Sequence, residues 1–399
     1  MNREEMKLAA RTGKTPFYVF DMDELKKRVV AIREMLKGTA SICYAIKANP
    51  FLVKALEGCV DKYEICSPGE YHIYEELGMP GDGMVYSGVY KDEETLELAL
   101  ERYHEHGIFT VESLQHFTLL WEWAKKHEKP VQVYLRLTSG NQFGMDEEIV
   151  KKMIRDREEY PLIRIEGIHY FSGTQKRKLE KLGKELAYLD QFCMNLQTEY
   201  QFQVKNLEYG PGAAISYFPA DKNVLSMEET VAGMKQFVDG MHFGGHVTLE
   251  MGRFLAAMCG YYFTRVCDRK QNAGENYCIV DGGIHQMNYD GQLKGMYLPY
   301  IEHLTETDTG LPQNTEGQKW NICGALCTVN DVICRQAPLG VVEIGDVFVF
   351  ERTGAYSVTE GMLHFLSRNL PEVFFYSKEE GLISVREPFM TYQLNRPNR

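Results

Sequence analysis

The sequence contains no long apolar run. No segment approaches the roughly 18 apolar residues of a membrane span, and residues 1–5 are mostly polar or charged where a secretory signal would be apolar. We therefore expect a soluble, cytoplasmic protein that has no membrane partner.

Positive charge and paired cysteines are also scarce. The 399 residues include 44 Lys and Arg against 56 Asp and Glu, a formal net charge of -12, so the phosphates of a nucleic acid would be repelled and no nucleic-acid partner is expected. Ten cysteines are scattered without a C-x-x-C pair or a His/Cys cluster at zinc-ligand spacing. We expect neither a disulfide framework nor a metal site.

What the chain does contain is a regular alternation of short apolar runs and longer amphipathic stretches. This alternation predicts strand-helix units with a parallel sheet. The strand candidates are 41–46, 62–65, 83–86, 107–111, 131–137, 163–169, 203–209 and 246–250. The helix candidates include 92–103, 113–127, 176–197 and 226–239. Eight such units favour a (β/α)8 barrel of the TIM type over residues 21–252, with functional groups at the C-terminal strand ends.

The pattern becomes β-rich after Arg253. Strands are predicted at 257–265, 277–280, 319–323, 346–351 and 380–385. The strand-like segment 15–20 precedes the first barrel helix, and we expect it to pair with this C-terminal sheet. The predicted second domain therefore combines residues 1–20 with 253–399.

Lys47 lies in the hexapeptide YAIKAN, residues 44–49, directly after the first predicted barrel strand. A lysine at such a strand end can project into a pocket, where partial burial favours the nucleophilic neutral amine needed for Schiff-base chemistry. This chemistry suggests pyridoxal 5'-phosphate as a cofactor. A solvated surface lysine is the alternative.

Other strand ends offer the remaining groups that this cofactor needs. Gly210 and Gly212 form a turn whose backbone N–H groups can hold a phosphate, although Pro211 removes one donor. Glu250 can bond the pyridine nitrogen, and Arg253 can add positive charge at the phosphate.

Two further residues follow the sixth barrel strand. His169 can stack on the cofactor ring, and Ser172 lies close enough in sequence to reach the phosphate. Each of these residues alone also fits an ordinary structural role, such as an ion pair or a hydrogen-bonded histidine.

Three residues of the β-rich part complete the candidate set. Asp281 can bind the amino group of a substrate, the Cys327 thiol can return a proton to a carbanion, and the Tyr356 hydroxyl can bind phosphate or substrate. A turn aspartate, an inert cysteine and a core tyrosine are the structural alternatives.

Taken together, these motifs resemble the fold-type-III pyridoxal phosphate decarboxylases, which include the diaminopimelate, ornithine and arginine decarboxylases and share a barrel with alanine racemase. The resemblance covers nearly the whole chain. It rests on YAIKAN at 44–49, SPGE at 67–70, QFGM at 142–145, His169 with SGTQ at 172–175, GPG at 210–212, EMGR at 250–253, DGG at 281–283, GALC at 324–327 with Asp331, GD at 345–346 and GAY at 354–356.

The resemblance implies a role for each matching residue. Lys47 would attach the cofactor, His169 would stack on its ring and Glu250 would bind its ring nitrogen. The phosphate would lie at the 210–212 loop with Arg253 and Tyr356. It also implies that Cys327 donates a proton from the partner subunit of a homodimer whose active sites are shared.

The chain departs from the family pattern at three positions. Pro211 interrupts a glycine triplet, and Met251 replaces a proline. Thr328 stands where the diamine-forming enzymes have an acid that binds the distal amine, and threonine cannot supply that charge. We therefore expect an amino acid without a distal amine, or a modified or carrier-linked amino acid such as a glutamyl unit.

Three alternatives stay open. One is diaminopimelate decarboxylation in lysine biosynthesis. Another is amino-acid racemisation, against which the decarboxylase-like segment 324–331 speaks. The third is a non-catalytic homologue that binds the cofactor, although such proteins usually lose the lysine or the cysteine.

Overall fold

The computed structural model describes residues 1–305 and 318–397. The chain forms two compact units. The barrel unit comprises residues 28–215 and 223–255, and the sheet unit comprises residues 1–27, 216–222 and 256–399, so the chain passes between the units several times.

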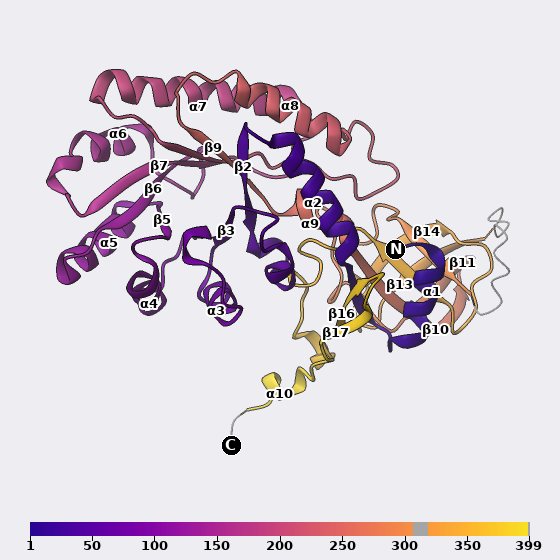
Figure 1. Ribbon diagram of the computed structural model, residues 1–399. Helices are drawn as coiled ribbons and strands as arrows, with labels where there is room; N and C mark the ends of the chain where they lie inside the picture. The colour runs from indigo at the N-terminus through magenta and orange to yellow at the C-terminus, as the bar shows by residue number, and fades with distance from the viewer. Residues whose placement is uncertain (306–317, 398–399) are drawn as a thin grey trace. The chain divides into compact units, whose positions relative to one another are not determined.

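The barrel unit contains a closed barrel of eight parallel strands, which confirms the predicted barrel. The last strand pairs with the first, with Cys43 opposite Glu250, and helices surround the strands (Figure 1). The strands are β2 (Ala40–Ala45), β3 (Lys62–Ile65), β4 (Met84–Tyr86), β5 (Ile108–Val111), β6 (Val131–Leu137), β7 (Ile163–Phe171), β8 (Asn206–Gly210) and β9 (His246–Met251).

The helices begin where the sequence supplies capping side chains. Asp92, Ser113 and Ser226 are N-caps whose side chains accept a backbone N–H of the first turn. The helices are α2 (Met22–Leu36), α3 (Pro68–Glu76), α4 (Glu93–Tyr103), α5 (Leu114–His127), α6 (Glu147–Arg155), α7 (Leu179–Tyr200), α8 (Met227–Asp239) and α9 (Arg253–Ala256). Helix α7 starts three residues later than predicted, because residue 176 is held in an extended bridge to Ala213.

The sheet unit has a nine-stranded mixed sheet in the part of the chain that is described. Its order is β14-β13-β11-β10-β1-β16-β17, with β15 pairing β10 and β12. The strands are β1 (Phe17–Asp21), β10 (Gly260–Asn272), β11 (Glu275–Val280), β12 (Ile301–Leu304), β13 (Lys319–Cys323), β14 (Val332–Pro338), β15 (Val347–Glu351), β16 (Glu372–Ser377) and β17 (Gly381–Arg386). Helices α1 (Arg3–Thr12) and α10 (Tyr392–Asn395) complete the unit.

Strand β1 confirms the prediction that an N-terminal segment joins the C-terminal sheet. It pairs antiparallel with β10 and parallel with β16, and all five of its residues are buried. The Phe17 ring stacks on Phe263 with a centroid distance of 4.6 Å. An N-terminal strand is thus part of the hydrophobic core of the sheet unit.

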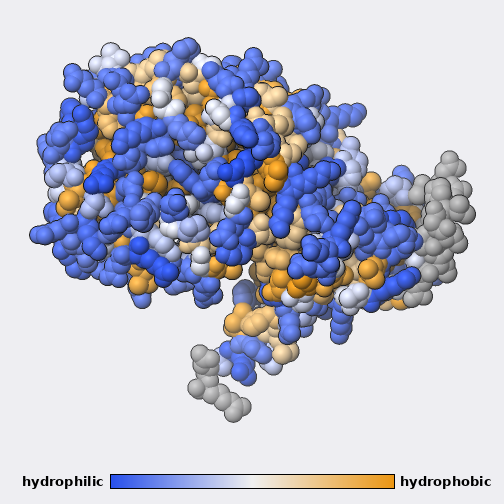
Figure 2. Space-filling view, viewed as in Figure 1, coloured by the Kyte–Doolittle hydropathy of each residue, from blue (hydrophilic) through white to orange (hydrophobic). Residues whose placement is uncertain are grey.

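None of the described helices is both long and apolar enough to cross a membrane. Hydrophilic residues cover much of the face shown in Figure 2, with smaller apolar areas between them.

Candidate active site

Lys47 lies just beyond strand β2, in a short 3-10 turn over Ile46–Ala48. The turn is fixed by the buried Tyr44, whose hydroxyl donates to the Asn49 carbonyl at 2.9 Å. The Lys47 side chain is 37% exposed, and its Nζ lies 3.3 Å from Glu250 Oε1 and in closer contact with Glu64 Oε2. The amine is therefore open to solvent on one side and held by two carboxylates on the other.

Glu250 and His169 form a buried pair beside this lysine. They extend from β9 and β7, their side chains are 5% and 1% exposed, and His169 Nε2 lies 3.0 Å from Glu250 Oε2. The structure thus brings together three of the predicted site residues, Lys47, His169 and Glu250, and adds Glu64 to them.

The two carboxylates beside Lys47 differ in their tendency to ionise. Burial and the charge of Glu250 raise the pKa of Glu64 above its usual value, although Lys47 opposes this effect. Burial also opposes ionisation of Glu250, but Lys47 and His169 outweigh it and hold the pKa of Glu250 well below its usual value. Glu250 therefore ionises more readily than Glu64.

The same side chains have the spacing of a cation site. Glu64, His169 and Glu250 each offer one ligand atom, and these atoms lie within 4.8 Å of one another. The Lys47 ammonium already bonds both carboxylates. A metal ion would have to displace that charge, so the arrangement suits the amine better than a metal.

The glycine loop after β8 is pressed against the segment that follows β7. Gly212 has a φ of +57°, and a Cβ at this position would lie 1.9 Å from the Gly173 carbonyl oxygen. The Lys176 N–H donates to the Gly212 carbonyl at 2.9 Å. Gly210 ends β8, and Ser172 begins the facing segment, so both predicted phosphate-binding segments lie side by side.

Arg253 is the first residue of α9 and is 8% exposed. It follows Glu250 by three positions, at the C-terminal end of β9 where the family pattern places it.

The other four predicted residues belong to the sheet unit. Asp281 Oδ1 accepts from Thr264 Oγ1 at 2.7 Å and from the Arg265 N–H at 2.9 Å. Cys327 is exposed and Thr328 is half-buried. Tyr356 is half-buried and has a φ of +66°, a strained backbone conformation for a bulky residue.

The loop that carries Cys327 is held in place by Asp331. This aspartate is 2% exposed and accepts the Ile284 N–H at 2.9 Å and the Leu326 N–H at 2.8 Å. The Ala325 N–H donates to the Gly282 carbonyl at 2.7 Å. The turn after Asp281 and the Cys327 loop are thus fastened together.

Several polar residues at the site were not predicted. Glu64 and Glu208 are 2% and 0% exposed in the barrel strands β3 and β8, and Lys176 and Glu185 lie behind the glycine loop. The sequence did contain a signal for Glu64 and Glu208. A glutamate inside a parallel strand that is buried on both faces is unusual and indicates a functional role. Lys176 and Glu185 gave no such signal, since both sit in an ordinary amphipathic stretch.

The barrel residues fit pyridoxal phosphate on structural grounds. A partly exposed amine lies beside an ionised, histidine-bound carboxylate that can bind a protonated ring nitrogen. A tight glycine turn, in which a side chain would clash, offers backbone groups for a phosphate.

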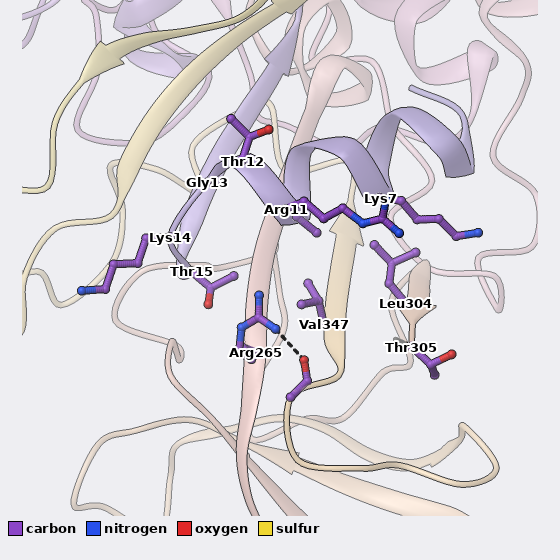
Figure 3. A pocket seen from close by; sticks show the side chains of 12 residues that line it. Lys7, Arg11, Thr12, Gly13, Lys14, Thr15, Arg265, Leu304, Thr305 and Val347 are labelled. Atoms are coloured by element: carbon purple, nitrogen blue, oxygen red, sulfur yellow. Dashed lines mark hydrogen bonds between the residues drawn. The ribbon is translucent and has the colours of Figure 1, made fainter. Parts of the chain in front are cut away.

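A cavity of about 680 Å³ lies elsewhere, in the sheet unit (Figure 3). Its cationic side chains are Lys7, Arg11, Lys14 and Arg265, and Arg265 donates to the Gly345 carbonyl at 2.6 Å. Among the described residues that line it there is no carboxylate and no predicted site residue. It therefore lacks the carboxylates that the barrel site places beside its lysine.

Comparison with known proteins supports the same chemistry. A family model described as "Pyridoxal-dependent decarboxylase, C-terminal sheet domain" matches residues 17–354. L-glutamyl-(BtrI acyl-carrier protein) decarboxylase of Niallia circulans is 25% identical over 93% of this chain and 91% of its own length. Diaminopimelate decarboxylase of Aquifex aeolicus is 26% identical over 96% of this chain and 92% of its own length. The solved diaminopimelate decarboxylase of Methanocaldococcus jannaschii shares the fold, with a TM-score of 0.84, 23% identity and coverage of 97% and 92%.

Proposed function

We propose, because this chain belongs to the pyridoxal-dependent decarboxylase family, that it removes the α-carboxylate of an amino acid as CO2 and releases the amine. The observation that carries this proposal is the cluster of Lys47, Glu250 and His169 at the C-terminal rim of the barrel. The family membership makes pyridoxal 5'-phosphate the expected cofactor.

The cluster divides the work between its residues. When bound, the cofactor supplies an electron sink for the pair left on the α-carbon when CO2 departs. Lys47 Nζ is the amine that would join the cofactor aldehyde. Glu250, kept ionised by its neighbours, would accept the N–H of the ring, and His169 would hold Glu250 through Nε2. Arg253 and the 210–212 loop would bind the phosphate.

Cys327 would complete the site from a second copy of the chain, and Tyr356 would bind the cofactor phosphate. Cys327 is exposed on a loop fixed by Asp331, so its thiol could donate a proton to the α-carbon. The neighbouring Val329 is 90% exposed, and Leu293 and Met362 are 69% and 51% exposed at the rim of a cavity of about 310 Å³. Exposed apolar groups of this kind support a homodimer that covers them.

The substrate proposal rests on Thr328. A threonine next to Cys327 cannot pair with a distal ammonium, whereas it can lie beside a neutral or modified side chain. The Niallia circulans relative, whose name specifies a glutamyl group on an acyl-carrier protein, supports the same class. We therefore propose a non-basic amino acid, either free or carrier-linked, as substrate. Asp281 would lie near its amino group.

Replacing Lys47 tests the reaction. Lys47→Ala should abolish CO2 release and the cofactor absorbance band that borohydride reduction fixes to the protein. Lys54→Ala is the matched control, because Lys54 is 50% exposed and pairs with Glu57 on the surface. Near-normal decarboxylation by the Lys47 variant would refute the assignment.

A substrate screen tests the specificity. Glutamate, free and loaded on an acyl carrier, should react faster than lysine, ornithine, arginine or diaminopimelate, whose basic side chains Thr328 cannot pair with. Diaminopimelate is the second candidate, because relatives and solved structures of that activity match along most of the chain. Strong activity on it would overturn the argument from Thr328, and a chirally inverted product without CO2 would indicate a racemase.

A further inference from the structure

Glu185, on helix α7, lies behind the glycine loop and accepts hydrogen bonds from three side chains. Ser172 Oγ donates to its Oε1 at 2.6 Å, and Lys176 Nζ and Tyr209 Oη both donate to its Oε2 at 2.7 Å. The Lys176 and Glu185 side chains are 2% and 11% exposed. These contacts lie within the barrel unit and form one buried polar network.

The network is joined to the loop that would bind the phosphate. Besides the bond from the Lys176 N–H to Gly212, the Ala214 N–H donates to the Lys176 carbonyl at 3.3 Å. The Gln175 amide bonds both backbone groups of Ile215, at 2.8 Å and 3.3 Å. Movement of Lys176 would therefore move the loop as well.

The hydroxyl of Ser172 has only one proton to donate. In this structure that proton is directed at Glu185, and the Tyr170 hydroxyl lies beside the same serine. A serine hydroxyl that donates to a carboxylate cannot donate to a phosphate dianion at the same time. The carboxylate and the phosphate must therefore compete for it.

We propose that the Ser172 hydroxyl is exchanged between Glu185 and the cofactor phosphate, and that Lys176 and Tyr209 are positioning residues that hold Glu185 when the serine leaves it. The inference rests on the proposed function, since it takes the phosphate of pyridoxal phosphate as the ligand. It assigns roles to three residues, Lys176, Glu185 and Tyr209, that do not themselves touch the cofactor.

The charges in the network suit this exchange. Burial opposes ionisation of Glu185, but its bonds to Lys176, Ser172 and Tyr209 outweigh burial and lower its pKa below the usual value. After the exchange, the Glu185 carboxylate keeps Lys176 and Tyr209 as hydrogen-bond donors, so it is not left as an unpaired buried charge.

The test is a titration of cofactor-free protein with pyridoxal phosphate, followed by absorbance. Ser172→Ala should weaken binding about tenfold, the loss typical of one hydrogen bond to a charged group. Lys176→Met and Tyr209→Phe should also weaken it, because Glu185 with fewer donors holds the serine more firmly. Glu185→Gln should bind the cofactor no more weakly than the wild type.

Double variants distinguish exchange from a simple charge effect. If Lys176 acts through Glu185 and Ser172, then Lys176→Met should add little to Ser172→Ala. If Lys176 acts only by its charge on the phosphate, Lys176→Met will lower the affinity by the same factor in the wild type and in the Ser172→Ala variant. That result would overturn the proposal. Equal weakening by Glu185→Gln and Ser172→Ala would overturn it too.

Two controls complete the design. Pyridoxal, which lacks the phosphate, should bind all the variants equally, and Glu180→Gln should change nothing because Glu180 is exposed on the same helix. Thermal unfolding of the cofactor-free variants separates misfolding from altered binding. If wild-type protein itself fails to bind pyridoxal phosphate, the proposed function fails; if it binds and the variants match it, only the exchange fails.

Discussion

The two carboxylates beside Lys47 illustrate how single residues set the properties of the site. Glu64 and Glu250 are almost equally buried, at 2% and 5% exposed. Only Glu250 also bonds His169, at 3.0 Å. That second partner helps to hold the pKa of Glu250 below that of Glu64, since both acids share Lys47.

This asymmetry predicts unequal effects of removing each acid. Glu250→Gln should lower kcat by roughly a hundredfold, a loss typical of a deleted electrostatic partner, and should shift the absorbance of the bound cofactor. Glu64→Gln should lower kcat far less, because the raised pKa of Glu64 makes it the less readily ionised of the two acids. Steady-state kinetics and spectra of both variants check this, and equal damage by the two substitutions would contradict it.

Glu208, also inside the barrel, predicts a dependence of stability on pH. Burial raises its pKa from the usual 4.5 to about 7, outweighing the opposing effects of Lys62 and His169. Within the described chain, neither of its carboxylate oxygens has a hydrogen-bond partner. The folded protein therefore binds this proton more tightly than the unfolded chain does.

The sign of the effect follows from that difference. Between pH 4.5 and about pH 7 the folded state retains a proton that the unfolded state has lost, so stability falls as pH rises through this range. The change corresponds to about 3 kcal/mol. Glu208→Gln should remove this dependence of stability on pH. Urea unfolding at pH values on either side of the range measures it. The control is Glu148→Gln, at an 85% exposed position, which should leave the dependence intact.

At the scale of single elements, the loop after β8 shows why its glycines are needed. A Cβ on Gly212 would meet the Gly173 carbonyl at 1.9 Å, whereas one on Gly38, with a φ of +76°, would meet nothing within 4 Å. Gly38→Ala should therefore cost only the backbone strain, about 1 kcal/mol. Gly212→Ala should lower the melting temperature more than Gly38→Ala does, and it should weaken cofactor binding at least tenfold. Equal effects of the two substitutions would argue against a tight phosphate loop.

The elements that were predictable are those specified by local pattern. The eight barrel strands are short apolar runs between amphipathic helices, and caps such as Ser226 mark where helices start. Strands β12, β14 and β16 were missed. Strand β16, for example, depends on β1 and β17 for its pairing, and such long-range pairing leaves little trace in a local pattern.

The residues of the candidate site also divide into those that the local pattern predicts and those that depend on contacts made only in the folded chain. Lys47, His169 and Glu250 were predictable because each follows or ends a barrel strand and belongs to a family motif. Lys176 was predicted as the start of a helix, but its N–H bonds Gly212 and its side chain bonds Glu185. Gly212 is 36 residues further along the chain, and Glu185 meets Lys176 only because residue 176 lies outside the helix, so the local pattern could not reveal either contact.

At the scale of the whole molecule, the sheet unit is assembled from three separate stretches of chain. Strand β1 lies between β10 and β16, and residues 216–222 join the unit through contacts such as Tyr217 with Tyr289, at a centroid distance of 5.4 Å. The C-terminal stretch alone therefore lacks a central strand of its own sheet.

This organisation predicts that residues 256–399 do not fold alone. The separated fragment would expose the edges of β10 and β16 that β1 normally covers, so it should aggregate. Solubility and circular dichroism of the fragment test this. In the full chain, Val19→Asp at a buried β1 position should lower the melting temperature sharply, while Leu8→Asp, at a 59% exposed position, should not. A soluble, folded fragment would show that β1 is dispensable.

The closure of the barrel by β2 and β9 has a consequence for biosynthesis. Cys43 and Glu250 become neighbours only when the last barrel strand pairs with the first. A ribosome-bound nascent chain that already exposes Lys47 still lacks Glu250 until more than two hundred further residues have been translated. Vitamin B6 loading should therefore be a late event, and shortened translation products should emerge without it.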